Sequence, residues 1–170
     1  RWIELRGFVG HTYLNNFSPT NAYQYSMSLS GADGQQDLFV DEYYFGRNET
    51  QGIWSQQRDE NMGGFKSTSW YGTTSYTMAT ANLYFQFPIK PNIFGVFADF
   101  GTFYNGTSFN GAINTGLALR LGKVFGVYFP LWMSKQMDAA YNSKNYAERI
   151  RFTLKMNIQS KPLNFMKLLN

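Results

Sequence analysis

The 170-residue sequence contains no cysteine and only one histidine, His11. The absence of cysteine excludes disulfides and thiolate metal sites. A single histidine also excludes zinc sites that need two, including the His-Glu-x-x-His motif of metallopeptidases. A Ser-His-Asp triad would have to use His11, and no Gly-x-Ser-x-Gly turn accompanies it. His11 lies in an alternating segment beside Tyr13, which favours a structural role.

Charged residues and long apolar runs are also scarce. Charged residues make up 15% of the chain, the net charge is +4, and the lysines and arginines are scattered, so a nucleic-acid partner is not expected. No stretch approaches 18 apolar residues, which excludes a transmembrane helix. Mean hydropathy is −0.36, a value compatible with membrane strands that alternate lipid-facing and lumen-facing residues. The sequence begins with Arg1-Trp2-Ile3, without an initiator methionine or a signal peptide, and we interpret the chain as a fragment or a processed product.

Aromatic residues, at 19%, and 16 glycines dominate what is present, a composition that favours strands and turns. Apolar and polar residues alternate with a period of two, most clearly over 22–30 and 149–158. About eight strands are predicted, several of them about ten residues long, the length of a tilted strand that crosses a bilayer. The predicted strands are 2–13, 22–30, 37–45, 77–87, 93–104, 113–121, 124–132 and 149–158.

The lengths of the predicted connections alternate as well. Links at 31–34, 90–92 and 122–123 are short, whereas those at 15–21, 46–75, 105–112 and 133–147 are longer. Short turns on one rim and long loops on the other are typical of outer-membrane barrels, with periplasmic turns and extracellular loops. The pattern predicts an all-β, antiparallel, up-and-down transmembrane β-barrel over 1–158, with a long extracellular loop at about 46–75. A periplasmic tail follows at 159–170, either amphipathic or frayed.

Aromatic residues also gather near the predicted strand ends, as the interfacial girdles of a membrane barrel require. A general preference of aromatic residues for strands is the competing explanation. The residues concerned are Trp2, Tyr13, Tyr43, Tyr44, Tyr76, Phe103, Tyr104, Tyr128, Trp132 and Tyr146.

Four segments in the second half resemble, in order, the C-terminal end of the BamA-type barrel superfamily. Segment 81–89 ends a strand in an aromatic-Pro pair, and 97–101 reads aromatic-x-Asp-x-Gly. Segments 116–120 and 127–131 resemble the penultimate hairpin, and 149–154 resembles the closing strand. Five predicted strands follow the long loop, as in that family. The resemblance implies a barrel for protein assembly or translocation, with these strands forming part of a larger barrel.

In that family the long loop carries an Arg-Gly-aromatic tip that enters the lumen and pairs with the strand aspartate, here Asp99. This sequence departs from the pattern, because it offers Phe-Gly-Arg at 45–47 and Gly-Gly-Phe-Lys at 63–66. Arg47 is therefore the predicted partner of Asp99, with Arg58 and Lys66 as alternatives. A carboxylate buried in a lumen is costly without a cation or several donors, and a solvated Asp99 is the other possibility.

Residues 44–66 also resemble barrel segments that follow gluzincin-type metallopeptidase domains in large Bacteroidota surface proteins. That resemblance implies that any peptidase chemistry lies upstream. Within this chain, the adjacent carboxylates 41–42 and 59–60 point apart on a strand and make poor acid–base couples. The Asp-Gly pair at 33–34 is a turn signal before it is a calcium ligand. No catalytic residue, metal ligand or cofactor is predicted.

The predicted function is a membrane anchor, or part of an assembly or translocation barrel, in the bacterial outer membrane. Its partners would be outer-membrane lipid and the rest of its own barrel or other outer-membrane or periplasmic proteins. Two alternatives remain open: a self-contained eight-stranded barrel for anchoring or adhesion, and a soluble lipocalin-like barrel that binds a small ligand. The long loop at 46–75 is open to three roles, which are plugging the lumen, contacting a partner or binding a ligand.

Overall fold

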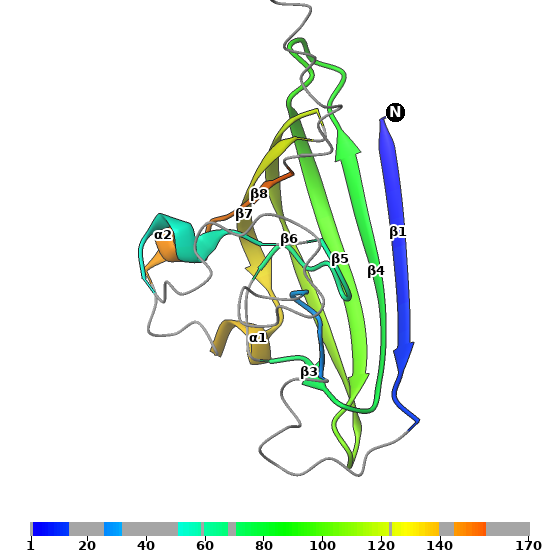
Figure 1. The fold of residues 1–170 in the computed structure, drawn as a ribbon. Coiled ribbons are helices and arrows are strands. Elements are labelled where there is room, and N and C mark those ends of the chain that lie inside the picture. The colour runs from blue at the N-terminus through cyan, green and yellow to red at the C-terminus, as the bar shows by residue number, and fades with distance from the viewer. Residues whose placement is uncertain are drawn as a thin grey trace, which may run out of the picture.

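The computed structural model describes residues 2–13, 26–31, 51–58, 60–67, 71–122, 124–139 and 145–155. Its main feature is an antiparallel six-stranded sheet of order β1-β4-β5-β6-β7-β8, curled like half of a barrel (Figure 1). The predicted all-β antiparallel fold is confirmed. The strands are β1 (Ile3–His11), β4 (Thr77–Gln86), β5 (Phe94–Tyr104), β6 (Phe109–Leu121), β7 (Phe125–Met133) and β8 (Arg151–Leu154).

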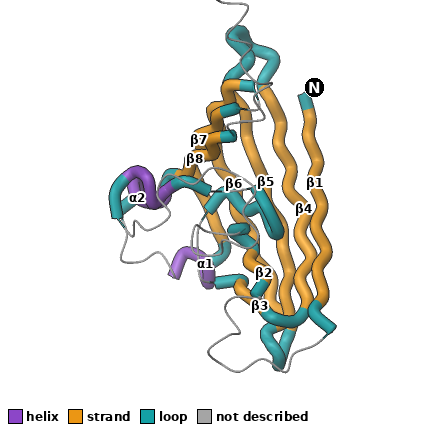
Figure 2. The backbone as a smooth tube through the Cα atoms, viewed as in Figure 1, coloured by secondary structure: helices purple, strands orange, loops and turns teal. Residues whose placement is uncertain are grey.

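Five short elements accompany the main sheet (Figure 2). Two form a separate two-stranded sheet, β2 (Met27–Ser28) and β3 (Thr73–Thr74). The others are the 3-10 helix η3 (Ile53–Gln56) and the helices α1 (Lys135–Ala139) and α2 (Tyr146–Arg149). None of the described helices is both long and apolar enough to cross a membrane.

The alternation predicted from the sequence sorts the side chains of the long strands onto two faces. In β4, Thr80, Asn82 and Tyr84 are buried on the concave face, whereas Leu83 and Phe85 are exposed on the convex face. The neighbouring strands β5 and β6 alternate in the same way. The convex face therefore exposes a row of large apolar side chains, which is unusual for a globular protein in water. Large apolar residues exposed on it include Ile3, Leu5, Val9, Leu83, Phe85, Phe94, Phe100, Leu117 and Leu131.

A hydrophobic cluster fills the concave side near the end of the sheet where β5 turns into β6. Phe103 from β5 and Met133 from β7 belong to it, and Met137 of α1 covers them. Leu29 and Phe65, from segments outside the main sheet, complete the cluster and are fully buried. The curled sheet thus has an interior that is packed by its own chain at this end.

The prediction of a long wall strand over 22–30 is wrong for the part that is described. Residues 26–31 contain only the two-residue β2, and the backbone of Leu29 bonds to Gly72 and Phe65 instead of to a wall strand. The side chain of Leu29 lies inside the hydrophobic cluster, so tertiary packing has placed this alternating segment on the concave side. The strand predicted at 37–45 lies outside the described residues.

Two further boundaries differ from the prediction. The connection predicted as long at 105–112 is short, because β6 already begins at Phe109. The Asn105 side chain accepts hydrogen bonds from the backbone N–H groups of Thr107 and Ser108, each at 2.9 Å, and so closes a tight turn. Short links thus occur at both ends of the sheet, which weakens the loop-length argument. The last strand begins at Arg151 instead of 149, because α2 occupies the preceding residues.

Candidate functional site: a buried polar network on the concave face

A polar row crosses four strands of the sheet on its concave face. Arg6, Asn82, Asp99 and Asn114 stand opposite one another in register on β1, β4, β5 and β6. Asn82 donates to one carboxylate oxygen of Asp99 at 3.0 Å, and Asn114 donates to the other at 3.3 Å. Arg6 donates in turn to the amide oxygen of Asn82 at 3.0 Å. The register of the sheet therefore builds a preformed cradle around a fully buried carboxylate.

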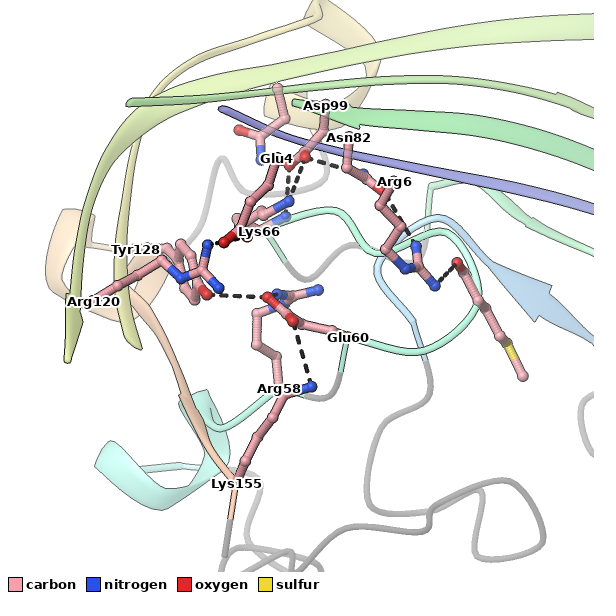
Figure 3. Close-up of polar contacts among 12 residues, drawn as sticks. Glu4, Arg6, Arg58, Glu60, Lys66, Asn82, Asp99, Arg120, Tyr128 and Lys155 are labelled. Carbon is pink, nitrogen blue, oxygen red and sulfur yellow. Dashed lines mark hydrogen bonds and ion pairs between the residues drawn. The ribbon is translucent and has the colours of Figure 1, made fainter. Parts of the chain in front are cut away.

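Lys66 completes this cradle from the segment that lies against the concave face (Figure 3). Its ammonium Nζ lies 2.8 Å from Asp99 Oδ1, and its backbone N–H donates to Asp99 Oδ2, also at 2.8 Å. Lys66 is one of the two alternative partners that the sequence predicts for Asp99, and the prediction of a solvated Asp99 is wrong, because its side chain is fully buried. Arg47, the first choice as partner of Asp99, lies outside the described residues, so its role stays a prediction. Arg58, the other alternative, pairs elsewhere.

The Lys66–Asp99 ion pair is almost completely buried, with side-chain exposures of 8% and 0%. Burial lowers the pKa of the Lys66 ammonium, while the charge of Asp99 acts in the opposite direction. The ammonium also lies 5.9 Å from the centre of the Phe97 ring. A buried pair of this kind is strongly destabilised when one partner is removed, since the other charge is left uncompensated.

Two glycines let the segment 60–67 approach the sheet closely enough for Lys66 to reach Asp99. Gly64 has φ +68°, and a Cβ there would lie 2.4 Å from Arg6 Nη1. A Cβ on Gly63 would lie 2.4 Å from the backbone of Leu29. Phe65 then anchors the segment in the hydrophobic cluster, and Arg6 donates to the Met62 carbonyl at 2.7 Å. Each residue of Gly-Gly-Phe-Lys thus has a defined part in seating the segment.

A second polar cluster ties the same segment to β7 and to the end of β8. The Glu60 carboxylate accepts a hydrogen bond from the Tyr128 hydroxyl at 3.1 Å and lies 3.4 Å from Lys155 Nζ. Arg58 Nη1 is 3.8 Å from Glu60, and its guanidinium lies over the Tyr128 ring. Burial alone would raise the pKa of Glu60, but Arg58, Lys155 and Lys66 outweigh it and lower that pKa to about 2. Glu60 is therefore ionised throughout the physiological range.

An ion pair bridges the curl of the sheet itself. Arg120 on β6 lies 2.6 Å from Glu4 on β1, although β4 and β5 separate these strands in the sheet. The Arg120 guanidinium also lies 4.4 Å from the centre of the Tyr84 ring. Two neighbouring open cavities remain beside this bridge, and Glu4, Glu60, Arg120 and Tyr128 line both of them. The concave side is thus packed at one end and hollow at the other.

The remaining candidates from the sequence occupy structural positions. His11 Nδ1 lies 2.7 Å from the Thr77 hydroxyl across β1 and β4, and its ring meets Tyr13 edge to face at 4.8 Å. Asp59, the neighbour of Glu60, lies outside the described residues, as do residues 33–34 and 41–42. Within the part of the chain that is described, no three His, Asp or Glu side chains gather in a way that could hold a metal ion.

Sequence reasoning missed the companions of Asp99, namely Arg6, Asn82 and Asn114. Their inward direction could be read from the alternation in each strand, but their alignment depends on the register between strands. Register is set by long-range packing and by turn geometry, so no single segment reveals it.

The described part of the predicted loop at 46–75 lies over the concave face. Arg58 donates its backbone N–H to the Phe152 carbonyl on β8, and Lys66 contacts Asp99 on β5. The segment therefore spans the curl from its β8 edge to its centre. No family model, curated protein or solved structure matches this chain.

Proposed function

We propose that this chain forms part of the wall of a β-barrel in the outer membrane of a bacterium, where it serves as a membrane anchor or as part of an assembly or translocation barrel. The observation that carries the proposal is the sheet itself, whose convex face is apolar and exposed and whose concave face carries a buried row of polar side chains beside the hydrophobic cluster. Lipid-facing and lumen-facing residues alternate in this way along the strands of outer-membrane barrels.

The convex face supports contact with lipid better than contact with water. Leu5 and Val9 on β1 are 76% and 79% exposed, and Phe100 and Leu117 on the central strands are also exposed. Soluble monomers rarely leave contiguous apolar patches of this extent uncovered. The long strands, of 9 to 13 residues, have the length expected of tilted membrane strands. A soluble lipocalin-like barrel would instead place its apolar residues inside.

The concave face supports a lumen filled by the protein's own chain. The segment 60–67 is held by Asp99 at its centre and by Phe65 in the hydrophobic cluster. A segment fixed in this way favours the plugging role among the three roles left open for the loop. The resemblance to BamA-type barrels implies a loop that enters the lumen and pairs with a strand aspartate, and Lys66 would take that part here. We place the C-terminus in the periplasm, and no residue of this chain is assigned a catalytic role.

Detergent dependence tests the proposal. The protein should remain folded only in detergent or lipid, and its folded form should migrate faster on a gel without boiling than the heated form. A folded, monomeric protein in water without detergent would refute the membrane assignment and favour the lipocalin-like alternative. Folding of this chain alone into vesicles as a closed, stable barrel would favour the self-contained eight-stranded alternative.

A further inference from the structure

The hollow end of the concave side carries a surplus of positive charge. Its two cavities, the larger of about 640 Å³, are lined by four cationic side chains against two carboxylates, a surplus of two charges. Behind the wall, Lys66 is paired with Asp99. Glu60 is paired there with Arg58, so counting both partners leaves the surplus unchanged. The six charged lining residues are Arg6, Lys66, Arg120, Lys155, Glu4 and Glu60.

The two carboxylates of the cavity walls already have donors. Glu4 accepts a hydrogen bond from Arg120 at 2.6 Å. Glu60 accepts one from the Tyr128 hydroxyl at 3.1 Å and lies 3.4 Å from Lys155 Nζ. A cation that entered the cavities would have to displace one of these donors and would add to the surplus of positive charge. The cavities therefore suit an anion better than a cation.

The Arg58 guanidinium is buried and has no hydrogen-bond acceptor among the described residues. Its side chain is only 2% exposed, and its Nη1 lies 3.8 Å from Glu60, beyond the length of a hydrogen bond. A guanidinium stays charged and has five N–H donors, so burying it without acceptors is costly. Figure 3 shows Arg58, Arg120 and Lys155 around the single carboxylate of Glu60. A second anionic group at this place would remove that cost.

Two further donors at the cavity wall are unused. The Arg120 guanidinium donates only to Glu4 in the described part of the chain. Tyr84, which lines the smaller cavity, is 6% exposed, and its hydroxyl has no partner among the described residues. Donors are thus in excess, whereas the carboxylates are engaged. Oxyanions complement such a set, because the planar fork of arginine binds pairs of phosphate or carboxylate oxygens.

The larger cavity opens at the end of the sheet where β6 turns into β7. Gly122 and Phe125 of that turn line it, together with Lys155 after β8. The hydrophobic cluster, with Met137 of α1, fills the other end of the concave side. A ligand therefore enters from inside the curl and not from the convex face, which favours a ligand dissolved in water over a lipid.

We propose that the hollow end of the concave side binds a doubly charged oxyanion of the phosphate class that is dissolved in water. Arg120 and Lys155 hold it at the cavity wall, and Arg58 compensates its charge from behind Glu60. A dianion matches the surplus of two positive charges on the walls. Only the side of the membrane rests on the proposed function: with the C-terminus in the periplasm, the cavity opens to the periplasm.

Calorimetric titration with inorganic phosphate at constant ionic strength tests the site in the protein folded in a non-ionic detergent. We expect one site per chain with a Kd of about 1 mM or tighter, and no saturable binding of chloride. Arg120→Gln should weaken phosphate binding about tenfold or more. Arg149→Gln is the matched control, because Arg149 is similarly exposed and lies 2.8 Å from Asp138 but does not line the cavities. It should bind phosphate like the parent.

Glu60→Gln should change the affinity in the opposite direction. Removing this carboxylate raises the surplus of positive charge and frees the donors of Tyr128 and Lys155 for the ligand. Phosphate binding should tighten about fivefold or more, since one elementary charge at about 4 Å contributes that much even in water. General damage to the fold would weaken binding instead. The direction of this change decides alone if Arg120→Gln does not fold.

Three results would overturn the proposal: no saturable phosphate binding, equal affinities of Arg120→Gln and Arg149→Gln, or weaker binding by Glu60→Gln. Micelles that contain phosphatidic acid distinguish the source of the phosphate group. The affinity for inorganic phosphate should be the same in these micelles as in detergent alone. Competition by phosphatidic acid would identify a lipid headgroup as the occupant and contradict the assignment to a water-soluble ligand.

Failure of this site and failure of the proposed function are distinguishable. A protein that folds only in detergent or lipid and does not bind phosphate would lose the site and keep the membrane assignment. A protein that is a folded monomer in water and binds phosphate as described would keep the site and lose the membrane assignment.

Discussion

Replacing Lys66 by methionine should destabilise the protein by about 3 kcal/mol. The substitution keeps the length of the side chain but removes the ammonium 2.8 Å from Asp99, which leaves a fully buried carboxylate without its cation. Breaking a buried ion pair in this way costs about 3–5 kcal/mol. We expect the lower end, because Asn82, Asn114 and the backbone N–H of residue 66 still donate to Asp99. The free energy of unfolding in urea from lipid vesicles, followed by tryptophan fluorescence, measures the effect.

The control for this substitution is Lys155→Met. Lys155 also pairs with a carboxylate, Glu60 at 3.4 Å, but its side chain is 37% exposed, so its loss should cost less than about 1 kcal/mol. In the double variant of Lys66→Met with Asp99→Asn, the charges are removed together. Its destabilisation should be smaller than the sum of the two single effects by about 2 kcal/mol. Equal effects of Lys66→Met and Lys155→Met, or additivity in the double variant, would refute the reasoning.

Three further predictions concern the segment on the concave face and the lipid side. Gly64→Ala should destabilise the fold by about 2–3 kcal/mol in the same urea assay, because it combines a positive φ with a Cβ placed against Arg6. The control is Gly52→Ala, which has φ +79° but open space around its Cβ and should cost only about 1 kcal/mol. The free energy of unfolding, measured as the pH is lowered, should show the contribution of Glu60, whose pKa is lowered from 4.5 to about 2. This contribution to stability, at most about 3 kcal/mol, is fully present above about pH 4.5 and is lost as the pH falls toward 2. A Glu60→Gln variant that shows the same acid-induced loss of stability as the parent would contradict this assignment. Leu83→Arg should cost about 2–4 kcal/mol in lipid, where a cation would face hydrocarbon, and a negligible effect would argue against lipid contact at this position.

The sequence predicted the long strands well, because a period of two is a local property that each strand carries by itself. The alternation around Asp99 in β5 correctly separates buried from exposed residues. The same alternation over 22–30 misled the prediction. It reports that a segment has two unlike faces, but not whether the segment joins the wall or packs inside it, as Leu29 does. That choice depends on contacts with Phe65 and Gly72, which are distant in sequence.

The polar network could be predicted only in part. A buried aspartate demands a cation, and that argument correctly reserved a partner for Asp99. It could not single out Lys66 among the possible partners, because the path of the segment 60–67 depends on Gly63, Gly64 and the anchoring of Phe65, which sequence spacing does not reveal. Arg47 lies outside the described residues, so its part stays a prediction. The short turn closed by Asn105 was also missed, since the strand after it continues through polar and glycine residues.

The most direct test of the central claim, that the convex face contacts lipid, is a nitroxide scan along β5. The absence of cysteine allows single labels to be placed in turn from Phe94 to Tyr104 without background. In reconstituted vesicles, collisions with oxygen should peak with a period of two at Val96, Ala98 and Phe100, and collisions with a water-soluble nickel chelate should be low there. A label at Thr107, in the exposed link to β6, should show the reverse. High nickel accessibility at Phe100 would contradict the account.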